Sequence, residues 1–516
     1  GDYTLNTAWK NLAVVMRECT TAACSAFTAT PAACSTDAFS VRPAGISSAV
    51  SNETPPGAGN AATNGATSGD PKFKAGGDPF ALTATIAGIA GNPNGYTGVP
   101  KVDNNGLQTV APATTLGSVA GTFPAATSGT PDAAATGTGF TYSEVGAFRF
   151  RGYNPASDTA SNRGVFDGVM SATECAALTA AQCDALRAAS WTGVDSISSK
   201  NDCIANSYAN VRDTSGTYAT NANYGKLGCN FGLTADSAAM GRFYPHHFDT
   251  EIPEHACSNA FTYSGQPFKL KATAKNAGGQ TTVNYAGALA KAGTYADGNG
   301  AAGSFTPATL PAATYAAGVA DLTDFDAPPP LVPEPDRVRF AYTSKLTAPT
   351  TLKLRLTDAD GASSAGYTEG TTPLRSGRLR LSSVYGYSSP LQMPVEAQYW
   401  SGASWVKNAA DNCTALAGAN LLLTPVGWAV TAPGTLVNGA GNITLTPTGP
   451  GSVTLCADLG PDPVGGAACV ATGAGRAWLQ SKWPPGANYD NDPSAMATFG
   501  VFSPEGRKGI YNRELY

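Results

Sequence analysis

The chain has 516 residues, and its 32 Lys and Arg against 37 Asp and Glu give a net charge of −5. The length predicts about three or four domains, and the acidic balance argues against a nucleic-acid partner, which needs a basic face. Only 13% of the residues are charged, and 59 Gly and 36 Pro accompany abundant Ala, Ser and Thr. This composition is typical of β-strands separated by weakly charged loops, as in surface proteins, and not of a cytosolic enzyme.

The cysteines indicate an oxidising location. No two of them form a Cys-x-x-Cys pair, which removes the main support for a zinc ribbon or a thioredoxin-type site. A loop-rich β-protein with few charges gains about 2–4 kcal/mol from each disulfide. We therefore predict disulfide bonding, with the pairing left open, among Cys19, Cys24, Cys34, Cys175, Cys183, Cys203, Cys229, Cys257, Cys413, Cys456 and Cys469. The odd count leaves one thiol free, bonded to another chain or paired outside this sequence.

No apolar run approaches the roughly 18 residues that cross a bilayer, so we predict no membrane span in this chain. The longest candidate, Phe80–Gly91, is short and interrupted by Thr and Gly. The sequence starts at Gly1 without Met or a charged and apolar leader. This start predicts that a signal peptide has been removed or that the sequence is a fragment.

The N-terminal part predicts short strands and a long loop. Asn11–Glu18 is a candidate strand, and three of the cysteines follow it closely. Phe39 and Val41 alternate before Pro43, which ends a second candidate strand. From Ser47 to Gly77 the chain is rich in Gly, Ala, Asn, Ser and Pro, and this tract predicts a loop or a disordered excursion.

An internal repeat then predicts two copies of one module. Pro79–Thr85 (PFALTAT) matches Pro267–Thr273 (PFKLKAT). Alternating strands, Ser143–Tyr153 and Asp336–Tyr342, are expected to close the two copies. Strands of this length separated by turn residues predict an immunoglobulin-like β-sandwich of about 100 residues in each copy.

A different segment separates the two copies. Within Ser171–Ser190, Ser171 to Glu174 and Thr179 to Gln182 each match the S/T-x-x-E/Q capping box, which predicts two short helical turns. With its cysteines, this segment is expected to be a small, disulfide-rich, partly helical insertion. The proline-rich Asp326–Pro335 is expected to be an extended linker.

The last third predicts further antiparallel β-structure. Leu352, Leu354 and Leu356 alternate with polar residues, as do Leu379 and Leu381, and this two-residue period gives a strand one buried face. The predicted fold is therefore mainly β, with tandem antiparallel β-sandwich (Ig-like) modules and the insertion. The expected domains are residues 1–160, the insertion at 161–240, the second module at 241–335 and a C-terminal β domain at 336–516.

Two groups of residues are weak metal-site candidates. His246, His247 and His255 lie close together in sequence with several carboxylates. Their spacing is not that of the His-Glu-x-x-His motif of a zinc-binding helix, so a structural or solvated loop is favoured. Asp358 and Asp360 resemble the start of a calcium loop but lack the downstream Glu, and turn chemistry explains them. Calcium is the one cofactor left open; no other is predicted.

A binding surface is the remaining candidate. Arg378 and Arg380, with Tyr399 and Trp400, could bind a glycan or an anionic polymer, since aromatic faces stack on sugars and Arg adds paired hydrogen bonds. Alternation alone equally predicts a solvated polar face with the aromatic side chains in the core. No GxSxG, P-loop or nucleotide-binding glycine motif occurs. We therefore predict no enzyme activity and no catalytic residues.

Several longer motifs carry a family resemblance: GRFYPHHFD (Gly241–Asp249), FTYSGQPF (Phe261–Phe268), the block from Leu354 to Trp400, DNCT (Asp411–Thr414) and the terminal ATFGVF…GIYNREL. With them the chain resembles the conserved C-terminal region of MshQ-like proteins. That family is encoded with MSHA-type (mannose-sensitive haemagglutinin) type IV pilus biogenesis genes in Gram-negative bacteria. The family often carries a further N-terminal lectin-like sandwich, and none of these motifs belongs to it, so a glycan-binding role of that domain is not part of what the resemblance implies.

The resemblance implies a secreted, extracellular or cell-surface protein of a Gram-negative bacterium. The expected function is a structural or adhesive part of a pilus or surface filament, acting through protein–protein contacts. The alternative is a carbohydrate-binding adhesin at a pilus tip. The expected partners are pilin or pilus-assembly proteins, surface glycans, and further copies of the chain through edge strands such as Asn11–Glu18 or Ile510–Leu515.

Overall fold

The structure is a computed structural model. It describes residues 9–12, 14–30, 33–34, 39–41, 43, 45–51, 73–88, 94–152, 164–167, 203–204, 227–228, 231–323, 338–461, 469, 475–484, 486 and 488–500. The predicted helical turns of Ser171–Ser190 and the predicted strand Ile510–Leu515 lie outside these residues, as does most of the predicted loop from Ser47 to Gly77. No helix in the described part of the chain is long and apolar enough to cross a membrane.

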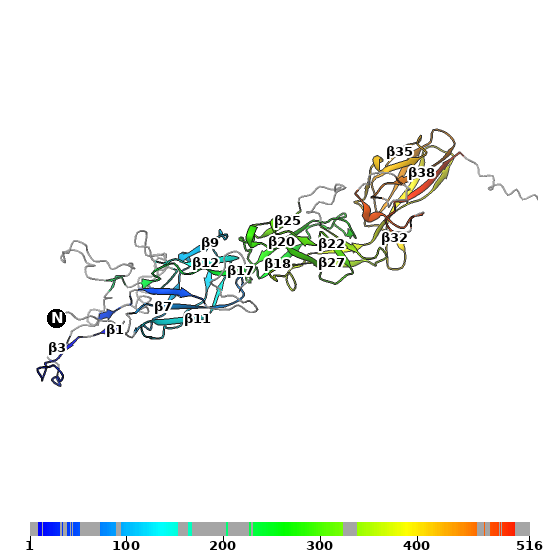
Figure 1. Ribbon diagram of the computed structural model, residues 1–516. Helices are drawn as coiled ribbons and strands as arrows, with labels where there is room; N and C mark the ends of the chain where they lie inside the picture. The colour runs from blue at the N-terminus through cyan, green and yellow to red at the C-terminus, as the bar shows by residue number, and fades with distance from the viewer. Residues whose placement is uncertain are drawn as a thin grey trace, which may run out of the picture. The chain divides into compact units, whose positions relative to one another are not determined.

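The prediction of a mainly β protein is confirmed (Figure 1). Helical structure within the described ranges is limited to short 3-10 turns: η1 (Asn104–Gly106), η2 (Gly287–Leu289), η3 (Ala312–Thr314), η4 (Gly418–Asn420) and η5 (Ala477–Leu479). The two-residue period gives the expected pattern of burial. In β27 (Thr350–Asp358), Leu352, Leu354 and Leu356 are buried while Lys353 and Arg355 are half-buried.

Two four-stranded sheets make the first sheet pair. One sheet has the order β10-β11-β7-β5 and the other the order β6-β17-β12-β9. Their strands are β5 (Ile46–Val50), β6 (Phe73–Lys74), β7 (Phe80–Ile86), β9 (Leu107–Val110), β10 (Val119–Ala120), β11 (Ala133–Tyr142), β12 (Gly146–Phe150) and β17 (Met240–Tyr244).

The second sheet pair starts at His247. Its sheets have the orders β18-β20-β25-β24 and β19-β28-β27-β21-β23. The strands besides β27 are β18 (His247–Glu251), β19 (Thr262–Tyr263), β20 (Leu270–Lys275), β21 (Gly293–Asp297), β23 (Thr309–Leu310), β24 (Tyr315–Ala316), β25 (Val319–Leu322) and β28 (Thr371–Arg375). The predicted domain boundary at residue 335 therefore falls inside this sheet pair, because β27 and β28 pair with strands on its N-terminal side.

The third sheet pair starts at Gly377, one residue after β28. Its sheets have the orders β29-β31-β37-β35 and β30-β39-β38-β34, and β32 (Trp405–Lys407) pairs with β31. The other strands are β29 (Gly377–Leu381), β30 (Val384–Gly386), β31 (Leu391–Trp400), β34 (Leu421–Thr424), β35 (Ala429–Thr431), β37 (Ala440–Thr446), β38 (Gly451–Ala457) and β39 (Ser494–Phe499).

The three sheet pairs repeat one strand order. In each pair the first strand is at the edge of one sheet, and the short second strand pairs in parallel with the last strand of the other sheet, as β6 does with β17, β19 with β28, and β30 with β39. The sequence repeat had revealed two copies, at β7 and β20. The third copy, in which β31 is the corresponding strand, has the same topology but lacks the Pro-Phe pair that begins the sequence repeat.

Buried side chains from both sheets form the cores. In the first sheet pair, Phe80 of β7 lies 6.5 Å from Phe148 of β12 and 5.7 Å from Phe243 of β17, measured between ring centroids. In the third, Leu379, Val395 and Ile443 of one sheet pack with Leu455 and Ala497 of the other. Burial of these apolar faces is the main stabilising contribution to each pair.

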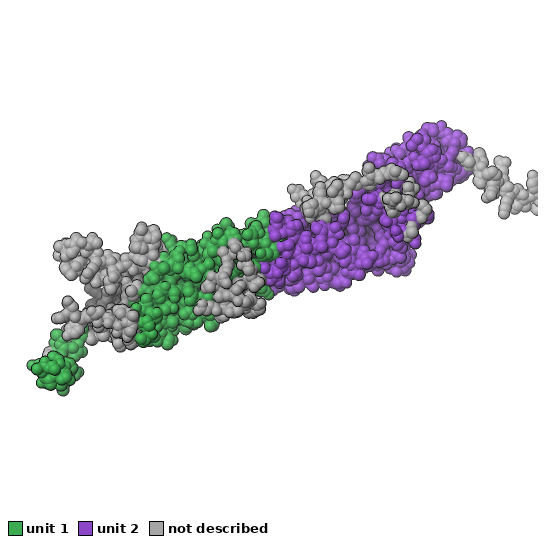
Figure 2. All heavy atoms as spheres, in the orientation of Figure 1, with its two compact units in different colours: residues 1–247, 274–291, 315–318 green, residues 248–273, 292–314, 319–516 purple. Residues whose placement is uncertain are grey.

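The remaining strands form small sheets: β1 (Trp9–Leu12) with β4 (Phe39–Val41), β2 (Val15–Met16) with β3 (Ala33–Cys34), β8 (Lys101–Val102) and β16 (Phe231–Gly232) with β13 (Val165–Asp167), β14 (Cys203–Ile204) with β15 (Leu227–Gly228), β22 (Gly303–Thr306) with β26 (Arg339–Tyr342), and β33 (Ala415–Leu416) with β36 (Gly434–Thr435). Figure 2 distinguishes two compact units, residues 1–247 with 274–291 and 315–318, and residues 248–273 with 292–314 and 319–516. The second unit contains the whole third sheet pair and most of the second.

Candidate functional site

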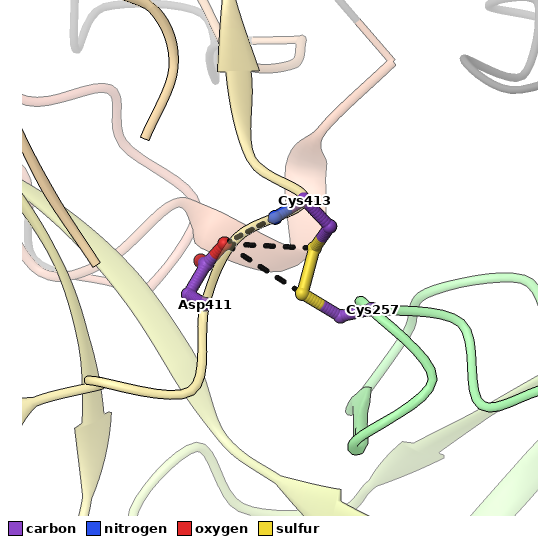
Figure 3. A group of neighbouring side chains, drawn as sticks. All are labelled: Cys257, Asp411 and Cys413. Carbon is purple, nitrogen blue, oxygen red and sulfur yellow. Dashed lines mark hydrogen bonds between the residues drawn. A yellow bond between two sulfur atoms is a disulfide. The ribbon is translucent and has the colours of Figure 1, made fainter. Parts of the chain in front are cut away.

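A disulfide joins two sheet pairs within the second unit. Cys257, in the loop before β19, bonds to Cys413, two residues before β33, with a Cα–Cα distance of 5.1 Å. The carboxylate of Asp411 lies beside it: Oδ1 is 3.6 Å from the sulfur of Cys257 and 3.5 Å from that of Cys413 (Figure 3). The bond thus fixes a loop of the second sheet pair to a loop of the third.

Asp411 is completely buried and fully hydrogen-bonded. Its Oδ1 accepts from the backbone N–H groups of Cys413 (3.1 Å) and Thr414 (2.9 Å). Its Oδ2 accepts from the hydroxyls of Thr414 and Tyr263, each at 2.7 Å. A buried carboxylate is costly without such donors, so these bonds keep the charge in place and order the loop around it.

The hydrogen bonds continue away from the disulfide. The Tyr263 hydroxyl accepts from Asn408 Nδ2 at 2.7 Å, and Asn408 Oδ1 accepts from Arg375 Nη1 at 2.5 Å. The Arg375 guanidinium lies 4.7 Å from the ring centroid of Phe261 and 4.8 Å from that of Tyr399. We call the disulfide with Asp411, Tyr263, Asn408 and Arg375 the junction network.

The protonation of Tyr263 fits its place in the network. Burial and the neighbouring Asp411 charge hold the pKa of the phenol well above its usual range. Tyr263 therefore stays a neutral donor to Asp411 at physiological pH. Only Asp411 and Arg375 carry charge, at opposite ends of the chain of hydrogen bonds.

Cys257, Asp411 and Cys413 are also the one group of three or more His, Cys, Asp or Glu side chains in the described ranges whose ligand atoms lie within 4.8 Å of one another. Cysteine binds a metal ion as a thiolate, and neither sulfur of a disulfide is a thiolate. We therefore interpret this group as a structural junction between the two sheet pairs.

The predicted histidine candidates lie at the start of the second sheet pair. Nδ1 of His246 is 3.1 Å from Nδ1 of His247, and burial, followed by the charge of Lys74, lowers the pKa of His246. His255 lies between β18 and β19, where its backbone N–H donates to Asn259. In this contact one Nδ1 atom carries the hydrogen and donates it, and the other Nδ1 atom accepts.

The predicted calcium-loop candidates form a turn. Asp358 Oδ1 accepts from the backbone N–H groups of Asp360 (3.0 Å) and Ala362 (2.9 Å) at the end of β27. Gly361, between them, has φ +89°, which favours glycine. An Asx turn therefore explains the position of the Asp358 carboxylate.

The four residues of the predicted binding surface divide into two groups. Tyr399 contacts Arg375 of the junction network. Arg378 donates from Nε to Gln398 Oε1 at 2.8 Å, and its guanidinium lies 4.5 Å from the Trp405 ring centroid and 4.9 Å from that of Trp483. Trp400 contacts Trp405 edge to face at 5.6 Å. Arg380 is exposed, opposite Glu396 in the sheet.

We call Arg378, Trp400, Trp405 and Trp483 the arginine–tryptophan platform. Burial, with a smaller effect of the Arg380 charge, lowers the pKa of Arg378 to about 10, so the guanidinium is still charged at neutral pH. Sequence reasoning missed Trp405 and Trp483. Trp405 follows Trp400 across a short turn and could have been found from the hairpin, whereas Trp483 is distant in sequence.

A second buried carboxylate, also missed, lies in the first unit. Glu144, between β11 and β12, accepts from the backbone N–H groups of Val145 (2.8 Å), Val283 (3.2 Å) and Asn284 (3.2 Å). Asn284 in turn donates to the carbonyls of Thr115 and Val145 and accepts from the N–H of Thr115. Burial raises the pKa of Glu144.

Two further disulfides complete those in the described residues, Cys19–Cys24 and Cys456–Cys469. Cys34 and Cys203 lie in β3 and β14, and nothing is described of their side chains. The predicted Cys175, Cys183 and Cys229 lie outside the described residues.

Family models match the C-terminal part of the chain. Residues 216–378 match DUF6701, third domain, and residues 375–515 match DUF6701, fourth domain. The border between the two matches coincides with Ser376, the single residue between the second and third sheet pairs. No curated protein matches the chain. The second and third sheet pairs are therefore similar to two consecutive domains of DUF6701 proteins.

Proposed function

We propose that this protein is a secreted, disulfide-stabilised structural or adhesive component of a type IV (MSHA-like) pilus or bacterial surface filament, and that each sheet pair is an immunoglobulin-like sandwich. The resemblance of the GRFYPHHFD and FTYSGQPF motifs to MshQ-like proteins gives the proposal its biological setting. In the first sheet pair, β5, β7, β10 and β11 form one sheet. When the short β6 is left out, these are the first, second, fourth and fifth strands of the pair, which is the order typical of such sandwiches.

The junction network is the observation that carries the structural role. One residue, Ser376, connects β28 to β29, and the Cys257–Cys413 bond closes a second covalent path between the same sheet pairs. Two covalent connections and a buried network restrict hinge motion far more than one flexible linker does. Such a restriction suits a spacer that must transmit position or force.

Exposed strands offer the protein–protein contacts that the proposal needs. Val15 and Met16 of β2 are 50% and 60% exposed, next to the loop closed by Cys19–Cys24. Exposed apolar strands are typical sites for strand addition by a neighbouring chain. This supports assembly with pilin, assembly proteins or further copies.

The test is the location of the chain in the bacterium that encodes it. Filaments sheared from intact cells are probed with an antibody against the third sheet pair. We expect the chain in the filament fraction of the parent strain and its loss from that fraction when the major pilin gene is deleted. A chain found only in the cytoplasm, or equally abundant without the pilin, contradicts the proposal.

A further inference from the structure

The arginine–tryptophan platform lies on one face of the sheet β29-β31-β32. Arg378 pairs with Gln398, Gln398 pairs with Lys407, and Trp400 pairs with Trp405. Residues two apart in a strand share a face. Arg380 and Glu396 therefore continue the same face, while Leu379, Leu381 and Ala397 are buried on the other.

The platform is rigidly built around Arg378. Its guanidinium contacts the rings of both Trp405 and Trp483, and its Nε donates to Gln398 Oε1. Gln398 is in turn fixed by donating to Glu396 at 3.0 Å. A guanidinium held in this way presents its two terminal nitrogens in one plane, which is the geometry that a carboxylate accepts.

The charge on this face is positive. Strands β29, β31 and β32 carry the cations Arg378, Arg380 and Lys407 against one carboxylate, Glu396. Arg380 and Lys407 are exposed and on either side of Arg378 and Gln398 in the sheet. The charge complementarity therefore favours an anionic ligand.

The aromatic part of the platform restricts the ligand further. Trp400 and Trp405 are both half-buried, and their rings contact each other edge to face. The Trp483 indole N–H is buried and has no acceptor among the described atoms. Flat apolar rings beside charged donors suit a ligand with an apolar C–H face and a carboxylate, and a pyranose acid has both.

We propose that the platform is a binding site for acidic carbohydrate, with a uronic acid residue stacked on Trp400 and its carboxylate bound by Arg378 and Arg380. This site is distinct from the strand contacts of the proposed filament role and does not depend on them. A neutral sugar is a poorer ligand because it has no carboxylate for the two arginines to bind. An anionic polymer without sugar rings is also poorer, because it has no flat C–H face to stack on Trp400.

The test is calorimetric titration of the full chain with a galacturonic acid hexamer. We expect a Kd on the order of 0.1 mM. Trp400→Ala should weaken binding about tenfold or more, which corresponds to about 1.4 kcal/mol of lost stacking. Arg380→Gln should weaken it about threefold to tenfold and reduce its salt dependence. Trp428→Ala, at a half-buried tryptophan away from the platform, and Arg339→Gln are the matched controls, and both should bind as the parent does.

Three results overturn the inference. One is the absence of binding to the galacturonic acid hexamer. Another is equal affinity for a neutral glucose hexamer, which removes the role of the arginines. The third is a Trp400→Ala variant that binds both the hexamer and dextran sulfate as the parent does, which leaves a general anionic attraction. Unchanged thermal unfolding of each variant shows that a loss of binding is local.

Discussion

Two buried carboxylates, Glu144 in the first unit and Asp411 in the second, each accept hydrogen bonds from two segments that are distant in sequence. Glu144 is bonded by three backbone N–H groups, two of them from the loop that carries Asn284. Asp411 is bonded by two backbone N–H groups and two hydroxyls and lies against a disulfide. Both positions order a loop around a charge that burial disfavours.

The difference between them lies in what else holds the loops. At Asp411 a covalent bond keeps the loops together whatever the state of the carboxylate. At Glu144 the described contacts are hydrogen bonds, with Asn284 bridging Thr115 and Val145. The comparison indicates that the loops at Asp411 depend on a disulfide, whereas those at Glu144 depend on hydrogen bonds alone.

Removing the disulfide should have the largest effect. The Cys257→Ser, Cys413→Ser double variant opens a loop with a sequence separation of 156 residues, and loop-closure entropy predicts a loss of up to about 5 kcal/mol. Guanidinium unfolding followed by tryptophan fluorescence measures it, because five tryptophans lie in or beside the third sheet pair, Trp400, Trp405, Trp428, Trp478 and Trp483. The parent protein in reducing buffer is the matched control. A loss below about 1 kcal/mol contradicts a stabilising role of the bond.

Asp411→Ala should come next. It leaves the Tyr263 and Thr414 hydroxyls and two backbone N–H groups without their acceptor, at a cost of roughly 4 kcal/mol in the free energy of unfolding. The control is Asp360→Ala, at a turn residue of the same unit. The same unfolding curve for Asp411→Ala as for the control would show that water replaces the carboxylate.

Asn284→Ala tests the hydrogen bonds around Glu144 in the first unit. It removes the amide that bonds Thr115 and Val145, and we expect a loss of about 2 kcal/mol in the first unit. Hydrogen exchange of the Thr115 and Asn284 amides should quicken, while Tyr263 and Thr414 keep their protection. Quicker exchange at both sites would mean that the two regions are not independent.

The pH dependence should be the smallest effect. Because burial raises the folded-state pKa of Glu144, the folded protein binds this proton more tightly than the unfolded chain does. The contribution to stability is therefore complete below the unfolded pKa of about 4.3 and is lost as pH rises through the folded value. Glu144→Gln should flatten this decline in unfolding curves measured from pH 4 upwards. A parent protein and a Glu144→Gln variant with the same pH dependence of stability contradict the expectation.

The sequence predicted strands better than sites. Leu352, Leu354 and Leu356 alternate plainly, and each is buried. Of the four residues of the predicted binding surface, Arg378 and Trp400 lie on one face of the sheet, whereas Tyr399 lies one residue out of phase and contacts Arg375 instead. A period of two gives the face of a residue but not its partner in the next loop.

Residue order alone determined the β class, because alternating side chains and frequent turn residues act locally. Only the tertiary structure decided that Cys257 meets Cys413, that Trp483 stacks on Arg378, and that Glu144 accepts from Asn284. Each of these contacts joins residues about 105 to 156 positions apart, and such pairings depend on how the sheets fold rather than on any local pattern.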